Sequence, residues 1–215
     1  MDLNSLGIGV IDLRIGNAAS VSSMLSRRRI NNCIVRDPEK LVQCDRIILP
    51  GVGNFGAFAS ALRSLGFDEV LSRLILEKGI PILGICVGAQ VLLEGSEESK
   101  HEPGLGFIPG HNQRIKGNES RFIPRVGWDY LDISEEVKDS QTLLKLEGSK
   151  FYFTHSFKLV PDDESHSLAF SKFGPSITSI IRKGNILGVQ FHPEKSLIHG
   201  ENFLSHFAKG EFDVA

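Results

Sequence analysis

The stretch Ile82-Leu83-Gly84-Ile85-Cys86-Val87-Gly88-Ala89-Gln90 decides the fold of this sequence. The apolar run over residues 80–85 predicts a buried strand, and residues 87–94 predict a helix. Cys86 stands at the turn between them, in a G-x-C-x-G pattern. A strand that enters a helix through so sharp a turn is typical of a parallel sheet covered by helices.

The residues before this stretch alternate between short apolar runs and amphipathic runs. The apolar runs predict strands, and the amphipathic runs predict helices because their apolar side chains recur at helical spacing. Short apolar strands separated by helices indicate a parallel sheet that is buried on both faces. The expected strands are residues 8–11, 33–35 and 46–49, and the expected helices are residues 17–29, 55–65 and 67–77.

The second half of the chain is richer in strand patterns joined by short turns. We expect strands over residues 151–153, 168–173, 177–181 and 186–191, a hairpin turn at Gly184-Asn185 and a closing helix over 201–208. Residues 94–106 are polar and predict a surface loop. The prediction is therefore an α/β fold in one domain over residues 1–215. Its doubly wound, mostly parallel sheet carries helices on both faces and has an antiparallel C-terminal extension.

Composition favours a globular protein and excludes several kinds of partner. The 215 residues are 41% hydrophobic and 23% charged, with a formal net charge of −2. No basic excess is available to bind nucleic acid. The longest apolar run, residues 82–93, is shorter than the ~20 residues that a membrane span needs. The chain starts without a cationic leader or a small-residue cleavage site, so we expect a cytoplasmic protein.

The three cysteines, Cys33, Cys44 and Cys86, show no CxxC spacing. They therefore indicate neither a disulfide framework nor a zinc site, and we expect no metal and no cofactor. Cys33 and Cys44 lie in or beside strand patterns and are assigned structural roles. Cys86 is the candidate nucleophile, because the start of a helix stabilises a thiolate. Its structural alternative is a cysteine buried for packing alone.

His192 and Glu194 are the candidate base and its orienting carboxylate. They follow a predicted strand, and residues i and i+2 of an extended segment point to the same side. Glu194 can then bond one ring nitrogen of His192 and leave the other for a thiol. Two alternatives are a surface His-Pro turn and a metal site completed by a distant histidine such as His155.

A glycine-rich loop, Leu49-Pro50-Gly51-Val52-Gly53, ends another strand and should open on the same edge of the sheet as Cys86. Such loops can aim backbone N–H groups at a developing oxyanion, and the N–H groups of Val52 and Val87 are our candidates for this role. Gln90 lies one helical turn after Cys86, within reach of a bound polar substrate. The alternatives are an ordinary Pro-Gly turn and a surface glutamine.

These motifs together resemble the class I, or triad, glutamine amidotransferases. The resemblance rests on P-G-V-G at 50–53, G-I-C-V-G-A-Q at 84–90 and Q-F-H-P-E at 190–194, in that order. It implies a flavodoxin-like fold in which Cys86, His192 and Glu194 release ammonia from glutamine. Within the family, the chain is most similar to the glutaminase subunits of imidazole glycerol phosphate synthases. That likeness spans nearly the whole chain and includes Tyr152-Phe153-Thr154-His155-Ser156.

The resemblance also implies which residues bind the substrate. Gly53, Gln90 and Ser156 are expected to hold glutamine. His192 is expected to take the proton of Cys86, and the resulting thiolate to attack the side-chain amide of glutamine. Water then hydrolyses the glutamyl thioester.

A partner subunit is implied in the same way. It would be a synthase (cyclase) subunit with a (β/α)₈ barrel, which forms a heterodimer with this subunit and receives the ammonia for histidine biosynthesis. Asn17, Arg125 and Trp128 are expected at that interface, since aromatic residues and arginine are enriched in interface cores. Neither nucleic acid nor a membrane is expected as a partner.

The chain departs from the subunit pattern in three segments. It has D-L-R-I-G-N at 12–17 where D-Y-G-x-G-N is usual, P-R-V-G-W-D at 124–129 where P-H-M-G-W-N is usual, and C-V-G-A-Q at 86–90 where C-L-G-M-Q is usual. The first two segments lie near the partner in the family. A paralogous subunit that supplies ammonia for acetamidino-sugar synthesis in surface polysaccharides is therefore an alternative. A catalytically silent binding module and another hydrolase, such as a peptidase, are two more.

Overall fold

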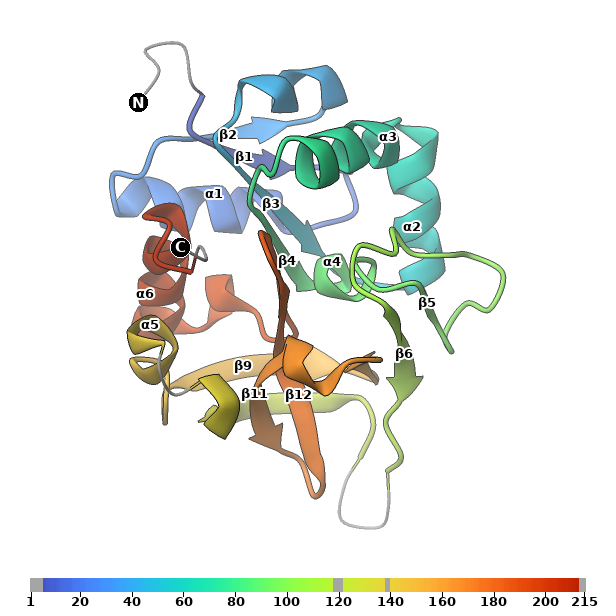
Figure 1. Cartoon of the computed structure of the whole chain (residues 1–215), viewed down its shortest axis with the longest axis vertical. Helices are drawn as coiled ribbons and strands as arrows, with labels where there is room; N and C mark the ends of the chain where they lie inside the picture. Colours follow the sequence, from blue (N-terminus) through green and yellow to red (C-terminus); the bar gives the residue numbers. More distant parts are fainter. Residues whose placement is uncertain (1–5, 118–121, 138–139, 213–215) are drawn as a thin grey trace.

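The centre of the structure is an eight-stranded sheet, seen edge-on near the middle of Figure 1. The computed structural model describes residues 6–117, 122–137 and 140–212. The strands lie in the order β2 (Asn32–Val35), β1 (Ile8–Ile11), β3 (Arg46–Gly51), β4 (Ile82–Cys86), β13 (Ile186–Val189), β12 (Ser176–Lys183), β11 (Ser167–Lys172) and β8 (Asp132–Ile133). The first five are parallel, and the last three are antiparallel to their neighbours. The expected doubly wound sheet with an antiparallel extension is confirmed.

Helices cover both faces of this sheet. In Figure 1, α1 (Ala18–Arg27) and α6 (Leu197–Ala208) lie on one side, and α2 (Phe55–Ser64) and α3 (Phe67–Ser72) lie on the other. Every residue of β1, β4 and β13 is buried, which is why these strands read as continuous apolar runs. The shorter helical elements are α4 (Val87–Gln90), α5 (Gln141–Leu144), the 3₁₀ turns η1 (Pro38–Gln43), η3 (Glu135–Val137), η4 (Glu164–His166) and η5 (Pro193–Lys195), and the π-helical turn η2 (Arg73–Glu77). In the part of the chain that the structure describes, no helix has the length and apolarity of a membrane span.

Two smaller sheets lie beside the main one. One contains β10 (Phe157–Pro161), β6 (Gly110–Arg114) and β5 (Gly95–Ser96), and the other pairs β7 (Arg125–Tyr130) with β9 (Lys150–His155). The sequence did not predict β6, β7 or β10. β6 and β7 contain several polar or charged residues, and β10 is a run of only five residues that includes Lys158 and ends at Pro161. The short strand β5 lies inside residues 94–106, which were expected to be a loop only.

Several helix boundaries differ from the prediction. α1 ends at Arg27 instead of residue 29, and the helix expected over residues 67–77 is α3 followed by the π-helical turn η2. α6 begins at Leu197, four residues before residue 201, and α4 ends at Gln90 instead of residue 94. α4 stops early because a returning segment donates backbone hydrogen bonds to the next three carbonyl groups. These bonds join Leu105 N to Val91 O, Ile108 N to Leu92 O, and Gly106 N to Leu93 O.

The strand register brings the motifs together at one edge of the main sheet. Gly51, in the glycine-rich loop, pairs with Cys86. On the other side of β4, Val189 pairs with Ile85, so that Gln190 and the residues after it continue beside Cys86. Carboxyl ends of parallel strands meet at such an edge, which is where α/β proteins bind their ligands.

Candidate active site

Cys86 has a strained backbone at the junction of β4 and α4. Its φ of 55° and ψ of −111° lie in a region that residues with side chains rarely adopt. The flanking glycines make the turn possible, because a Cβ on Gly88 would lie 1.8 Å from Leu49 O, and one on Gly84 would lie 2.5 Å from Gly88 O. The chain therefore needs glycine on both sides of the cysteine.

His192 and Glu194 form a buried hydrogen-bonded pair. His192 Nδ1 lies 2.8 Å from Glu194 Oε1, and both side chains are 1% exposed. The main chain of His192 is fixed to β9, since its N–H donates to Tyr152 O at 2.9 Å. Asn17 Nδ2 also donates to Glu194 Oε1, at 3.1 Å. Asn17 precedes α1, as expected, but its side chain makes no cap bond and holds this carboxylate instead.

The charges around His192 favour its imidazolium form. Burial by itself lowers the pKa of His192, but the neighbouring Cys86 and the hydrogen-bonded Glu194 carboxylate outweigh it and raise the pKa to about 10. For Glu194, burial raises the pKa, whereas the hydrogen bonds from His192 and Asn17 lower it more strongly. His192 Nε2 is buried and makes no hydrogen bond. One ring nitrogen is thus held by a carboxylate, and the other remains available to the reacting groups.

A cavity of about 320 Å³ opens over Cys86, a volume typical of sites for small molecules. Five of its lining residues besides the catalytic ones were expected from the sequence: Val52, Gly53, Val87, Gln90 and Ser156. Five others were not expected to line it: Glu98, Pro124, Thr154, Phe157 and Lys195. Glu98 and Pro124 come from loops, Thr154 and Phe157 from the small sheets, and Lys195 from η5. They were missed because the positions of these segments over Cys86 depend on the tertiary fold.

His155 also lines this cavity, although the sequence suggested it only as a metal ligand. Its Nδ1 lies 2.7 Å from Phe157 O, a carbonyl oxygen that can only accept, so Nδ1 carries the proton. Burial lowers the pKa of His155 to about 3, which keeps the ring neutral. Its Nε2 is buried without a hydrogen-bond partner. Within residues 6–117, 122–137 and 140–212, no three His, Cys, Asp or Glu side chains converge to hold a metal ion.

An apolar surface adjoins the cavity on the outer face of β7 and β9. Val126, Trp128 and Tyr130 point outward from β7 and are 60%, 42% and 56% exposed. The Trp128 ring packs edge-on against Tyr152 of β9, with 5.9 Å between the ring centroids. Thr154, opposite Val126, lines the cavity itself. We call this area the β7–β9 face, and its exposed aromatic side chains are typical of a contact surface.

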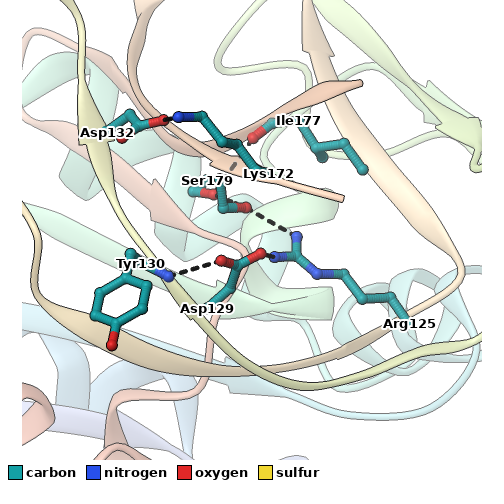
Figure 2. A network of polar contacts seen from close by, with 8 residues as sticks. Arg125, Asp129, Tyr130, Asp132, Lys172, Ile177 and Ser179 are labelled. Carbon is teal, nitrogen blue, oxygen red and sulfur yellow. Dashed lines mark hydrogen bonds and ion pairs between the residues drawn. The ribbon is translucent and has the colours of Figure 1, made fainter. Parts of the chain in front are cut away.

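Arg125 does not lie on the β7–β9 face, although the sequence suggested it for a partner interface. Its side chain points to the opposite side of β7 and is buried. Figure 2 shows its guanidinium beside Asp129. Arg125 Nη2 donates to Asp129 Oδ2 at 2.6 Å, and Nη1 donates to Ser171 Oγ at 2.8 Å. The guanidinium also lies 4.0 Å from the Phe153 ring centroid. Arg125 thus cannot contact a partner through its charged group, and Trp128 remains the expected interface residue.

The two departures from the subunit pattern at 125 and 129 therefore form one ion pair. Burial lowers the pKa of Arg125, and Asp129 acts in the opposite direction. We expect Arg125→Met to destabilise the fold by about 3 kcal/mol, because it leaves Asp129 without its partner. The double variant Arg125→His/Asp129→Asn, which restores the usual residues, should be more stable than the two single changes predict. Urea unfolding of the wild type, Arg125→His, Asp129→Asn and the double variant measures this coupling. Effects of the two single changes that add up within about 0.5 kcal/mol would contradict it.

Comparisons with known proteins agree with this geometry. The family model of class I glutamine amidotransferases matches residues 10–209. The chain is 39% identical to imidazole glycerol phosphate synthase subunit HisH of Zymomonas mobilis, covering 93% of this chain and 94% of that protein. It is 36% identical to subunit HisH 2 of Methanococcus maripaludis, with 94% and 98% covered. A solved glutamine amidotransferase superposes with a TM-score of 0.75 at 21% identity, over 95% of this chain and 98% of that one, which supports the fold.

Sequence similarity of this extent settles the family. The relatives match almost from end to end, and the family model spans the motifs around both Cys86 and His192. The chain belongs to the class I glutamine amidotransferases, and within them to the family of the glutamine-hydrolysing HisH subunits.

Proposed function

We propose that Cys86, His192 and Glu194 act as the catalytic triad that releases ammonia from glutamine. The observation that carries this proposal is the buried His192–Glu194 pair, whose histidine lines the same cavity as Cys86. The raised pKa of His192 favours a resting thiolate–imidazolium pair. The sulfur attacks the side-chain amide carbon of glutamine, and the imidazolium donates its Nε2 proton to the departing nitrogen, which leaves as ammonia.

A second step completes the cycle. Neutral His192 takes a proton from water, the resulting hydroxide adds to the thioester carbon, and glutamate leaves as the sulfur regains its electron pair. The backbone N–H groups of Val52 and Val87 are proposed to stabilise the oxyanion in both steps. Gly53, Gln90 and Ser156 are proposed to hold the glutamine. All five of these residues line the cavity over Cys86, which supports these roles.

We further propose that a synthase (cyclase) subunit with a (β/α)₈ barrel covers the β7–β9 face in a heterodimer. Ammonia that escapes to water becomes protonated and loses its nucleophilic electron pair, so a covered exit keeps it reactive. The β7–β9 face reaches the rim of the cavity at Thr154. Asn17, whose side chain donates a hydrogen bond to Glu194, belongs to residues 12–17, one of the two segments expected near the partner. The chain is proposed to act as one amidotransferase domain, and its cytoplasmic location remains a prediction.

The partner is tested by measuring glutamate release by the chain alone and with a histidine-pathway cyclase subunit. We expect about 5- to 150-fold activation by the correct synthase. Trp128→Ala should weaken binding of that subunit about 30-fold, the effect of losing a buried aromatic contact at an interface. Leu76→Ala, which removes an exposed apolar side chain outside the β7–β9 face, is the matched control.

A parallel titration with a sugar-modifying synthetase separates the two candidate acceptors. Activation by that protein alone would assign the chain to surface-polysaccharide synthesis. Equal rates of glutamate release with and without either partner would reject the coupling.

A further inference from the structure

Gln190 lies against the sulfur of Cys86, and the triad mechanism gives it no task. Its side chain is fully buried, and its Nε2 lies 3.7 Å from Cys86 Sγ, a hydrogen-bond distance for sulfur. The contact joins residues 104 positions apart. It follows from the pairing of β13 with β4, because Val189 lies opposite Ile85 and the next residue of each strand continues alongside. The backbone N–H of Gln190 also donates to Ser179 O at 2.9 Å, which fixes the position of its main chain.

The orientation of the Gln190 carboxamide is set by a chain of donors and acceptors. The chain begins at Phe157 O, a carbonyl that can only accept, so Gln90 presents its Nε2 there, at 3.4 Å. The same nitrogen of Gln90 donates to Gln190 Oε1 at 3.2 Å. With its oxygen taken by Gln90, Gln190 has only its NH₂ group to direct at Cys86. The reversed amide would place nitrogen against nitrogen and oxygen against sulfur, both unfavourable.

We propose that Gln190 is a further catalytic residue, whose carboxamide N–H holds the Cys86 sulfur as a thiolate directed into the cavity. The inference rests on the proposed role of Cys86 as the nucleophile. Cys86 is itself only 4% exposed, so few water molecules reach its sulfur, and a buried anion needs hydrogen-bond donors from the protein. Gln190 supplies one without adding a charge, and His192 supplies the opposite charge.

The same contacts connect substrate binding to the nucleophile. Gln90 lines the cavity and at the same time fixes the Gln190 amide. Asn112 Nδ2 donates to the backbone oxygen of Gln90 at 2.9 Å, which restrains the main chain of Gln90. Any displacement of the Gln90 side chain by bound glutamine therefore reaches the sulfur through two hydrogen bonds. Replacing Gln90 should change the reactivity of Cys86 even when glutamine is absent.

The experiment measures how fast iodoacetamide alkylates Cys86 as a function of pH, with the labelled peptide quantified by mass spectrometry. Gln190→Met keeps the length of the side chain and removes the donor, and Gln190→Glu keeps its shape but places an anion beside the sulfur. Gln113→Met, on the exposed side of β6, is the matched control. Other titratable groups that line the cavity are unchanged in all three variants: Glu98, His155, His192 and Lys195.

We expect the alkylation midpoint to move up by about one pH unit in Gln190→Met, the effect of losing one hydrogen bond to an anion. The shift should be larger in Gln190→Glu, because like charges repel. The control should follow the wild type. Glutamine turnover should show a roughly tenfold lower kcat in Gln190→Met with little change in KM, since the lost bond acts on the nucleophile.

Coincident alkylation profiles for the wild type, Gln190→Met and Gln190→Glu would overturn the inference. If Gln190→Met does not fold, the isosteric Gln190→Glu still tests the contact, because an unchanged midpoint in that variant would show that the side chain at 190 does not act on the sulfur. If the wild type hydrolyses no glutamine with any synthase, the proposed function fails, and the alkylation profiles still test Gln190 separately.

Discussion

Cys86→Ala abolishes glutamine hydrolysis and leaves the fold intact. We expect a loss of at least about 10⁴-fold in kcat, because no other group in the cavity can form the thioester. The side chain that is lost is small, and the strained backbone of residue 86 is imposed by its neighbours, so stability should change by less than about 1 kcal/mol. Glutamate release measured with the activating synthase, together with urea unfolding, checks both parts.

The two other cysteines provide matched controls for this variant. Burial, with a further contribution from neighbouring Cys33, raises the pKa of Cys44 to about 12, so its thiol stays protonated and unreactive. Cys33→Ala and Cys44→Ala should therefore keep full activity and full labelling of Cys86 by a glutamine-mimicking electrophile. Turnover by Cys86→Ala at more than a few per cent of the wild-type rate would refute the assignment of the nucleophile.

Gly88→Ala should remove activity by a different route, through the backbone. The φ of Gly88 lies outside the left-handed region, so an alanine there meets no backbone strain and any effect is a steric clash. The added Cβ would lie 1.8 Å from Leu49 O, and neither atom can move without separating β3 from α4. We expect a loss of about 3 kcal/mol or more in the free energy of unfolding. In the protein that remains folded, Cys86 should be displaced from its position in the cavity. Urea unfolding and electrophile labelling measure the two effects.

Gly79→Ala is the control for that substitution. Gly79 has a φ of +69° and no atom within 4 Å of an added Cβ, so only backbone strain is introduced, at a cost of about 1 kcal/mol. Its activity should be unchanged. Equal stabilities for the two variants would show that the close approach at Gly88 does not constrain the turn.

The buried half of the fold was predictable from sequence because burial on both faces leaves a direct signal. β1, β4 and β13 are apolar throughout, β3 is apolar after its first residue, Arg46, and the predicted positions of all four were nearly correct. The strand β7 gave no such signal, since its sequence Arg-Val-Gly-Trp-Asp-Tyr mixes charges with aromatic residues. Its pattern becomes clear only when Arg125 and Asp129 are seen paired beneath the strand (Figure 2).

Site residues within the motifs could be named in advance, but several of their contacts could not. The i, i+2 spacing predicted that His192 and Glu194 would meet, and the structure shows that contact. The contact between Gln190 and Cys86 depends on the register of β13 against β4, which no local pattern specifies. Asn17 was correctly placed at a helix start, yet its bond to Glu194 spans 177 positions.

Alternate residues of β9 point to opposite faces of the strand and have different functions. Its even-numbered residues, from Lys150 to Thr154, are partly exposed toward the β7–β9 face, and its odd-numbered residues, from Phe151 to His155, are buried toward the core and the cavity. Substitutions at Lys150 and Tyr152, which do not line the cavity, can thus alter contacts with the proposed partner while catalysis is inherited unchanged. Paralogues with new biosynthetic destinations can arise this way, whereas a single inserted residue would exchange the two sets and destroy both properties.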